Sequence, residues 1–340
     1  MIVRHLLHHD SIASRRAFLG GLASAAGALA LGGCAGLGAT GARFDASSLS
    51  ADPTLLVTTT RKPVNGGRAE PWFGPERAST MTVARAKLVP PGDGRFSLAA
   101  AGLDDWRLGE VEPMSADVGD LLAEAGGPNL LIYVHGFNQT FEAAALDAAH
   151  LSDGIMFRGQ TMVFSWPSKA GLFDYAYDRD SAMWSRDEFE GVLQSIMANP
   201  GALGRIYIVA HSMGTMLTLE SLRQLYARYG DAVTGRIGAV VFAAPDIDMD
   251  VFASAIKRIG PLSGKITVIA ATNDRALALS GQIAGGMTRV GAAEKAALER
   301  LGVRVIDASE AGWGIINHDV FISNAQVRRA IRRSIDTAAG

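Results

Sequence analysis

Short runs of apolar residues alternate with stretches of helical periodicity from Thr54 onward. The apolar runs lie at 55–59, 81–89, 130–134, 161–165, 205–210, 239–243, 265–271 and 303–306. Most are nearly unbroken Val, Ile, Leu and Ala, which is typical of parallel strands covered on both faces. Helical spacing occurs at 141–151, 181–197, 213–229, 291–301 and 320–337. The alternation predicts an α/β fold with a mostly parallel, doubly wound sheet flanked by helices.

The first 42 residues follow a different pattern. Three arginines precede an uncharged stretch at 17–42, and the segment 14–19 (SRRAFL) resembles a twin-arginine export signal. Leu31-Gly32-Gly33-Cys34 within this stretch resembles a bacterial lipobox, and Cys34 is the single cysteine of the chain. We therefore expect an export signal at 1–33, a lipidated tether at 34–53 and one folded domain at 54–340. Two alternatives are an uncleaved membrane helix and cleavage without lipid.

Lipid on Cys34 would anchor the exported protein to a bacterial membrane on its periplasmic side. The whole chain has a net charge of −2, and cleavage before Cys34 would leave −4, because three arginines and Asp10 are removed. A mildly acidic body offers no basic field for nucleic acid and little attraction to anionic headgroups. We therefore expect anchoring by lipid alone and no nucleic-acid partner.

The most specific chemical signal is a serine on a predicted strand-to-helix turn. The run 205–210 leads into His211-Ser212-Met213-Gly214 and then into a stretch of helical spacing. Such a turn needs small residues two positions before and after the serine. Gly214 meets this need, and Ala210 replaces the more usual glycine. The turn would raise the Ser212 hydroxyl at a helix N-terminus, where negative charge is favoured, so Ser212 is the predicted nucleophile.

A serine nucleophile requires a base, which is usually histidine. Four histidines follow the predicted export signal: His135, His150, His211 and His318. The His211 ring should point away from the neighbouring serine, and His150 lies in a predicted helix. We expect His135, at the end of a predicted strand, to brace the loop that follows. His318 remains, in a loop after the last predicted strand, and is the expected base.

Two aspartates are candidates for the acid that orients the base. Asp274 follows the run 265–271, and Asp246 follows the run 239–243. Either one keeps the chain order Ser…Asp…His. We favour Asp274 because it lies in the usual acid loop, and the other aspartate would then cap a helix or order its loop.

Acyl transfer also requires hydrogen-bond donors for the developing oxyanion, each worth roughly 3 kcal/mol. The backbone N–H of Met213, directly after the serine, is the first predicted donor. The second is the N–H of Phe137 in His135-Gly136-Phe137-Asn138, where the glycine lets the backbone turn its amide inward.

Several segments together resemble a bacterial α/β-hydrolase family of serine hydrolases of unknown function. They are HGFN at 135–138, FSWPS at 164–168, the serine turn, APD at 244–246 and HDV at 318–320. Segments 59–62 and 73–77 also resemble the N-terminal region of that family, so the resemblance covers roughly 54–325. It implies an α/β-hydrolase domain at 54–340 and a serine triad, which the predictions above assign to Ser212, His318 and Asp274, with Asp246 as the alternative acid. Many members are exported or lipid-anchored, and the family indicates no agreed substrate.

Some features concern the substrate. Aromatic residues gather after Ser165, where they could line an acyl pocket or cover the sheet edge: Trp166, Phe173, Tyr175, Tyr177 and Trp184. Only 19 residues separate Pro245 from Lys265, which leaves no room there for a large cap domain. We expect no metal and no nucleotide cofactor, because histidine pairs at ligand spacing and a phosphate-binding glycine loop are missing.

These observations predict a serine hydrolase that cleaves carboxylic esters, of small molecules or lipids, through an acyl-Ser212 intermediate. One alternative is acyl transfer by the same triad, with an alcohol in place of water. Another is an envelope binding or scaffold protein that keeps the fold without turnover. The sequence does not indicate an oligomeric state.

Overall fold

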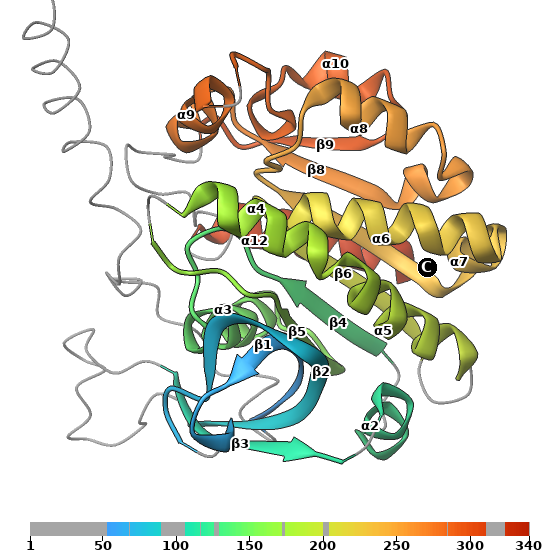
Figure 1. Ribbon diagram of the computed structural model, residues 1–340. Coiled ribbons are helices and arrows are strands. Elements are labelled where there is room, and N and C mark those ends of the chain that lie inside the picture. Colours follow the sequence, from blue (N-terminus) through green and yellow to red (C-terminus); the bar gives the residue numbers. More distant parts are fainter. Residues whose placement is uncertain are drawn as a thin grey trace, which may run out of the picture. The chain divides into compact units, whose positions relative to one another are not determined.

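A nine-stranded sheet forms the centre of the part of the chain that the structure describes (Figure 1). The computed structural model describes residues 53–67, 69–89, 106–115, 117–125, 129–171, 174–199, 204–283, 285–310 and 324–339. The strand order is β3-β2-β1-β5-β4-β6-β7-β8-β9. Six of the eight neighbouring strand pairs are parallel, whereas the pairs β1–β2 and β2–β3 at one edge are antiparallel. The predicted, mostly parallel sheet is therefore confirmed.

The bounds of the elements are as follows. The strands are β1 (Thr54–Pro63), β2 (Phe73–Val89), β3 (Arg107–Met114), β4 (Asn129–Val134), β5 (Gln160–Ser165), β6 (Arg205–His211), β7 (Ile237–Ala243), β8 (Ile266–Ala270) and β9 (Arg304–Asp307). The α-helices are α2 (Val118–Ala125), α3 (Phe141–Gly154), α4 (Tyr175–Trp184), α5 (Arg186–Ala198), α6 (Gly214–Tyr229), α7 (Asp231–Arg236), α8 (Met249–Ile256), α9 (Arg275–Ile283), α10 (Lys295–Glu299) and α12 (Ala325–Ala339). Short 3-10 helices are η1 (Asn65–Gly67), η3 (Gly260–Lys265) and η4 (Val290–Ala292).

Helices cover both faces of the sheet because successive side chains of a strand point to opposite faces. In β4, Ile132 and Val134 belong to the core that includes α5 and α6. Leu131 and Tyr133 of the same strand belong to the core that includes α3 and α12. Figure 1 shows α5 and α6 in front of the sheet and α12 behind it. Burial on both sides explains why the central strands read as unbroken apolar runs.

Each of the eight predicted strands is present, and one further strand is not marked by any apolar run. In the additional strand, β3, Val111 is the one buried residue, and most of the others are exposed. The strand lies at the sheet edge and pairs with β2 alone. An edge strand buries little surface, so its sequence need not alternate between apolar and polar residues.

The predicted helix at 181–197 is instead two helices, α4 and α5, which meet at Ser185. The Ser185 hydroxyl donates to the carbonyl oxygen of Ser181 at 2.9 Å and is hydrogen-bonded to the Thr60 hydroxyl at 2.8 Å. A serine side chain that bonds nearby backbone favours a helix boundary over a helix interior. The contact with β1 is a tertiary one, so local periodicity does not reveal it. Helices α2, α7, α8 and α9 lie outside the stretches with predicted helical spacing.

The connection between β7 and β8 holds only α8 and η3, so no cap domain is inserted there. Among the described helices, none combines the length and the apolar composition that a bilayer crossing demands. The predicted export signal at 1–33, Cys34 and the tether up to residue 52 lie outside the described residues.

Candidate active site

The carboxyl ends of β4, β6, β7 and β8 lie at one edge of the sheet, because these strands are mutually parallel neighbours. The loops that follow them begin at His135, Ser212, Ala244 and Ala271. In open α/β sheets this edge is where ligands bind. The topology therefore brings the predicted nucleophile, the predicted oxyanion loop and both candidate acids to the same side of the molecule.

Ser212 occupies a sharp turn between β6 and α6. Its φ is +48°, a left-handed conformation that costs a residue other than glycine on the order of 1 kcal/mol or more. Four hydrogen bonds hold the turn. The Ser212 N–H donates to the Ala243 carbonyl oxygen at 2.9 Å, and the Ser212 carbonyl oxygen accepts from the N–H groups of Thr215 and Asp246 and from the Thr215 hydroxyl. The serine is thus held in a strained turn at the helix N-terminus, as the sequence pattern predicts.

Two glycines explain why the turn needs small residues. A Cβ atom on Gly214 would lie 2.2 Å from the carbonyl oxygen of His135, which leaves no room for a side chain. A Cβ atom on Gly136 would lie 3.0 Å from the Cβ of Ser212 and 2.8 Å from Nδ1 of His211. The loop after β4 therefore lies directly against the serine turn. The segments that carry the predicted donors, Phe137 N–H and Met213 N–H, are in contact.

His135 is fully buried behind this loop, and its ring stacks on Trp166 with centroids 4.7 Å apart. Its Nδ1 lies 2.8 Å from the Gly136 carbonyl oxygen, and its Nε2 accepts from the Trp166 N–H at 3.1 Å. Burial, followed by the nearby Arg61 charge, lowers the pKa of His135 to about 3. A neutral ring with both nitrogens engaged braces the loop, which agrees with the role expected from the sequence.

Arg61 is the main residue at this edge that sequence reasoning missed. It is 1% exposed, and it donates to groups on three different segments. Its Nε donates to the Ser165 hydroxyl at 2.8 Å, and its guanidinium nitrogens donate to the carbonyl oxygens of Ser168 at 3.0 Å, Gln139 at 2.7 Å and Gly74 at 3.3 Å. Burial lowers the pKa of Arg61 to about 10, so the guanidinium remains charged at neutral pH. The available signal was the first charged residue after the uncharged stretch 54–60 of this strand, since a charge is rarely buried unless it is paired and hydrogen-bonded.

Asp178, on α4, continues this network. It is fully buried, and its carboxylate accepts from the Ser168 hydroxyl at 2.5 Å and from the N–H groups of Lys169 at 2.8 Å and Asn138 at 3.4 Å. Burial raises the pKa of Asp178, and its hydrogen bonds oppose that rise. Arg61 and Asp178 thus hold the two ends of the segment 138–139, which follows Phe137. Together they keep the predicted oxyanion loop in place.

The two candidate acids have different surroundings. The Asp246 carboxylate forms an ion pair with Arg289 at 3.1 Å and accepts from the hydroxyls of Ser280 at 2.7 Å and Tyr175 at 2.9 Å. Asp246 and Arg289 are both almost fully buried. The Asp274 side chain is 5% exposed, and its Oδ1 accepts from the Leu277 N–H at 3.1 Å at the start of α9.

The aromatic residues after Ser165 do not form one wall. Trp166 is buried against His135, and Tyr177 and Trp184 face the guanidinium of Arg77 on β2. Tyr175 reaches two of the loops named above, through Phe137 and through Asp246. It packs edge-on against Phe137 with ring centroids 5.7 Å apart, and burial together with Asp246 raises the pKa of Tyr175 to about 12. Phe173 lies outside the described residues.

The predicted base His318 also lies outside the described residues. Among the side chains that the structure describes, no three His, Cys, Asp or Glu residues gather closely enough to hold a metal ion. This edge thus holds a serine on a strained turn, a glycine-containing loop packed against it, and two buried aspartates in the loops after β7 and β8.

Comparison with protein families agrees with this geometry. Residues 112–334, about two thirds of the chain, match the family described as alpha/beta hydrolase of unknown function (DUF900). The chain belongs to this family. It is therefore an α/β-hydrolase, as the sequence motifs predict, and its mostly parallel sheet with flanking helices is the sheet of that fold. A search among curated proteins finds no match to this hydrolase.

Solved structures similar to the hydrolase include a cutinase and two esterases. A Trichoderma reesei cutinase is 12% identical over 65% of this chain and 89% of its own, with a TM-score of 0.33. Est1E from Butyrivibrio proteoclasticus is 11% identical over 76% of this chain and 95% of its own, with a TM-score of 0.38. An esterase from Pyrobaculum calidifontis is 13% identical over 84% of this chain and 86% of its own, with a TM-score of 0.37. At these scores the likeness carries no information about substrate.

Proposed function

We propose that this hydrolase cleaves carboxylic esters of small molecules or lipids through an acyl-Ser212 intermediate. One observation carries the proposal: Ser212 is held at positive φ between β6 and α6, with the glycine of the loop after β4 packed against it. This arrangement presents a hydroxyl at a helix N-terminus and leaves backbone N–H groups of two adjoining segments for a developing negative charge. It is the geometry that acyl transfer to serine requires.

In the first half of the proposed reaction, His318 removes the Ser212 hydroxyl proton while Oγ forms a bond to the ester carbonyl carbon. The carbonyl oxygen becomes an oxyanion, which accepts from the N–H groups of Phe137 and Met213. The C–O bond to the leaving group then breaks, and the departing alcohol takes the proton from His318. The acyl group remains on Ser212.

In the second half, water attacks the acyl carbon and gives one proton to His318. A second oxyanion forms and collapses, the bond to Ser212 Oγ breaks, and that oxygen takes the proton back. The products are a carboxylic acid and the original serine. Asp274 holds the imidazole in the tautomer that serves both steps.

The engagement of Asp246 supports Asp274 as this orienting acid, although Asp274 Oδ1 also caps α9 by accepting from the Leu277 N–H at 3.1 Å. The charge of Asp246 is already neutralised by Arg289, and both of its oxygens accept hydrogen bonds from other side chains. A carboxylate so engaged has little capacity to stabilise an imidazolium ion. Asp274 lies in the loop after β8 and takes no part in the ion pair between Asp246 and Arg289.

Labelling with a fluorophosphonate probe tests the proposal. The folded wild-type domain should be labelled and should hydrolyse p-nitrophenyl acetate, and Ser212→Ala should lose both activities. Ser263→Ala, at a partly exposed serine in η3, serves as the matched control and should keep both. Absence of labelling in folded protein would refute the proposal and favour an envelope binding protein. Transfer of the acyl group to an added alcohol in preference to water would replace hydrolysis by acyl transfer.

We also propose that the chain is exported and held on a bacterial membrane by lipid on Cys34. The lipobox-like segment that ends at the single cysteine supports this. After expression in a bacterium that recognises twin-arginine signals, the wild-type chain should fractionate with membranes, and Cys34→Ala should be released into the periplasm. Continued membrane association of Cys34→Ala would show that an uncleaved helix holds the protein.

A further inference from the structure

Tyr175, the first residue of α4, links two loops at the carboxyl edge of the sheet. Its hydroxyl donates to Oδ2 of Asp246, in the loop after β7, at 2.9 Å. Its ring packs edge-on against the ring of Phe137, in the loop after β4, with centroids 5.7 Å apart. The steps of the proposed reaction give Tyr175 no role. Its side chain nevertheless connects the residue that carries a predicted oxyanion donor to a buried carboxylate.

Asp246 gives the Tyr175 hydroxyl a fixed partner. Its Oδ1 forms the ion pair with Arg289 at 3.1 Å and accepts from the Ser280 hydroxyl at 2.7 Å, whereas Oδ2 accepts from Tyr175. Arg289 in turn donates to the Ser280 hydroxyl at 3.2 Å and to the Ser280 carbonyl oxygen at 3.3 Å. Turning the carboxylate away from the tyrosine would weaken an ion pair whose two charges are almost fully buried, which is costly.

The same aspartate is tied to the serine turn through its backbone. The Asp246 N–H donates to the Ser212 carbonyl oxygen at 3.2 Å. On the other side of the turn, a Cβ atom on Gly136 would lie 3.0 Å from the Cβ of Ser212, and Gly136 directly precedes Phe137. Five residues therefore form a closed ring of contacts: Ser212, Asp246, Tyr175, Phe137 and Gly136.

The first turn of α4 holds the loop after β4 at a second point. Asp178 lies three residues after Tyr175, a spacing that makes side chains neighbours on a helix. Its carboxylate accepts from the Asn138 N–H at 3.4 Å. Asn138 has a φ of +61°, so the chain turns sharply directly after Phe137. Phe137 and Asn138 are thus both held by α4, one through its ring and the other through its backbone.

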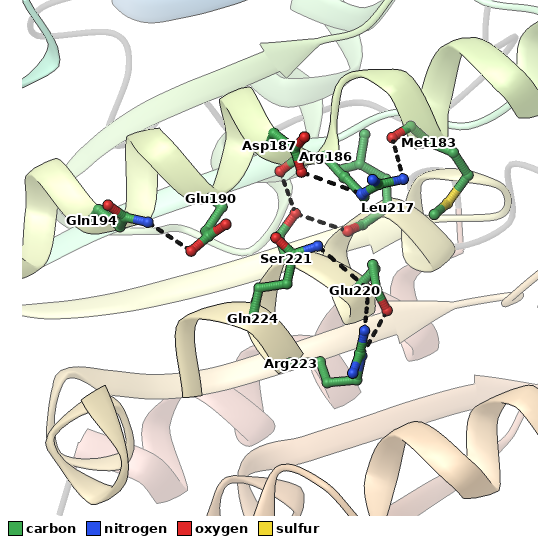
Figure 2. Close-up of polar contacts among 10 residues, drawn as sticks. All are labelled: Met183, Arg186, Asp187, Glu190, Gln194, Leu217, Glu220, Ser221, Arg223 and Gln224. Carbon is green, nitrogen blue, oxygen red and sulfur yellow. Dashed lines mark hydrogen bonds and ion pairs between the residues drawn. The ribbon is translucent and has the colours of Figure 1, made fainter. Parts of the chain in front are cut away.

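The far end of α4 is fixed to the helix that follows the nucleophile. Arg186 donates to the Met183 carbonyl oxygen at 3.3 Å, where α4 meets α5. The Ser221 hydroxyl of α6 donates to the Arg186 carbonyl oxygen at 2.9 Å, and Figure 2 shows both bonds. Because α6 begins directly after Ser212-Met213, α4 and the serine turn belong to one framework. The position of the Tyr175 ring relative to Ser212 then depends on its own side-chain contacts.

The hydroxyl is what fixes the Tyr175 ring. Burial, followed by the charge of Asp246, raises the pKa of Tyr175 to about 12, so the hydroxyl keeps its proton and donates near neutral pH. The ring is only half-buried, and packing alone would leave it other staggered rotamers. The hydrogen bond to Asp246 selects the rotamer that supports Phe137.

We propose that Tyr175 is a positioning residue for the oxyanion loop: anchored on Asp246, it holds Phe137 so that the Phe137 N–H donates to the oxyanion of the transition state. The inference rests on the proposed function, because it requires the oxyanion that forms when Ser212 attacks an ester carbonyl. Tyr175 itself does not touch the reacting atoms. It acts through Phe137, and the transition state gains more from it than the bound ester does, because the negative charge develops only there.

Tyr175→Phe keeps the ring and removes the hydroxyl. For p-nitrophenyl acetate we expect kcat to fall about tenfold at nearly constant KM, because a misplaced donor weakens transition-state binding more than substrate binding. Tyr226→Phe is the matched control. The Tyr226 hydroxyl also donates to an aspartate, Asp231, at 2.8 Å, but in the last turn of α6, at the other end of that helix from Ser212. It should leave kcat and KM unchanged.

A thionoester separates positioning from a loss of folded protein. In p-nitrophenyl thionoacetate, sulfur replaces the carbonyl oxygen and accepts hydrogen bonds poorly, so its turnover gains little from the N–H donors. The ratio of kcat/KM for the ester to kcat/KM for the thionoester is independent of the folded fraction, because that fraction cancels. Tyr175→Phe should lower this ratio about tenfold, and Tyr226→Phe should keep the wild-type ratio.

Phe137→Leu tests whether Tyr175 acts through Phe137. This substitution keeps the backbone N–H but removes the ring that contacts Tyr175, so it should also lower the ester-to-thionoester ratio. Substitutions that disrupt one shared contact are not additive. In the Phe137→Leu background, Tyr175→Phe should therefore change the ratio by no more than about twofold.

The outcomes distinguish this inference from the proposed function. An unchanged ester-to-thionoester ratio in Tyr175→Phe overturns the positioning role while Ser212-dependent hydrolysis stands, and so does full additivity with Phe137→Leu. Hydrolysis that persists in Ser212→Ala, or its complete absence in folded wild-type protein, overturns the proposed function and this inference with it.

Discussion

Gly136 lies directly against Ser212. A Cβ atom on residue 136 would come within 3.0 Å of the Cβ of Ser212, although the two residues belong to loops after different strands. The contact sets the distance between the loop after β4 and the strained serine turn. In the proposed mechanism the contact therefore controls whether the N–H groups of Phe137 and Met213 can both donate to one oxyanion.

Gly136→Ala should reduce catalysis more than stability, because the added methyl group pushes the loop away from the serine. We expect kcat/KM for a short ester to fall about 10²-fold, the cost of losing one oxyanion donor. Gly191→Ala on α5 is the matched control: a Cβ there meets nothing within 4 Å, and it should stabilise the protein by about 0.5–1 kcal/mol at unchanged activity. Full activity in Gly136→Ala would show that the loop does not supply a donor.

Asp274→Asn and Asp246→Asn should fail in different ways. Asp274→Asn should lower kcat about 10⁴-fold with little change in the free energy of unfolding, because the imidazole loses its correct tautomer. Asp246→Asn should lower the free energy of unfolding by about 3–5 kcal/mol, because it leaves Arg289 buried without its counter-charge. Steady-state kinetics and urea denaturation separate the two effects. The reverse order of kcat values would identify Asp246 as the triad acid.

The double variant Asp246→Asn/Arg289→Met should recover part of the stability lost in Asp246→Asn. Removing both charges avoids an unpaired one in the interior. Urea denaturation of the single and double variants measures the recovery. If the double variant is less stable than Asp246→Asn, the ion pair is not the source of the loss.

Arg61→Lys should impair positioning of the oxyanion loop although it preserves the charge. A lysine cannot reach Gln139, Ser165 and Ser168 at once, because it lacks the planar fork of donors. We expect kcat to fall on the order of 10²-fold at nearly constant KM, the size of effect that a small misplacement causes. Arg300→Lys at an exposed position is the control. A variant that loses stability but keeps kcat when folded would limit Arg61 to a structural role.

His135 should make the protein less stable in acid. The pKa of His135 is about 3 in the folded chain, against an ordinary value of 6.5. At pH values between these two pKa values, the imidazole is therefore protonated in the unfolded chain but not in the folded chain. The contribution is complete above pH 6.5 and is lost as the pH falls towards 3. By pH 4.5 the loss should be on the order of 2 kcal/mol.

Urea denaturation of the wild type and His135→Gln at pH 7 and 4.5 measures this contribution. The raised pKa of Asp178 acts in the opposite sense in both proteins, so the difference between the two chains isolates His135. The variant should lose less stability than the wild type between the two pH values. Equal losses would mean that His135 is protonated equally in the folded and unfolded chains.

Much of the fold could be predicted from the sequence because the central strands are buried on both faces. Leu130–Val134 and Arg205–Ala210 read as apolar runs, and their order with the intervening helices implies the parallel sheet. The serine turn could be predicted for a similar reason. Its requirements, a small residue on each side and a helix after it, are local and so are written in five consecutive residues.

Contacts between distant residues could not be predicted in this way. The break at Ser185 depends on a hydrogen bond to Thr60, 125 positions away, and the edge strand β3 buries too little surface to leave a pattern. Arg61 contacts Ser168, 107 positions away, because β1 pairs with β5 in the sheet. Local periodicity reports which face of an element is buried but not which element covers it.

By itself, the sequence determined the fold class and predicted Ser212 as the nucleophile and two candidate acids, because burial periodicity and turn chemistry act over a few neighbouring residues. Only the tertiary structure decided that Asp246 is paired with Arg289 and that Arg61 and Asp178 hold the predicted oxyanion loop. These contacts between distant residues depend on the order of strands in the sheet. That order brings buried charges and helix faces from distant parts of the chain into contact.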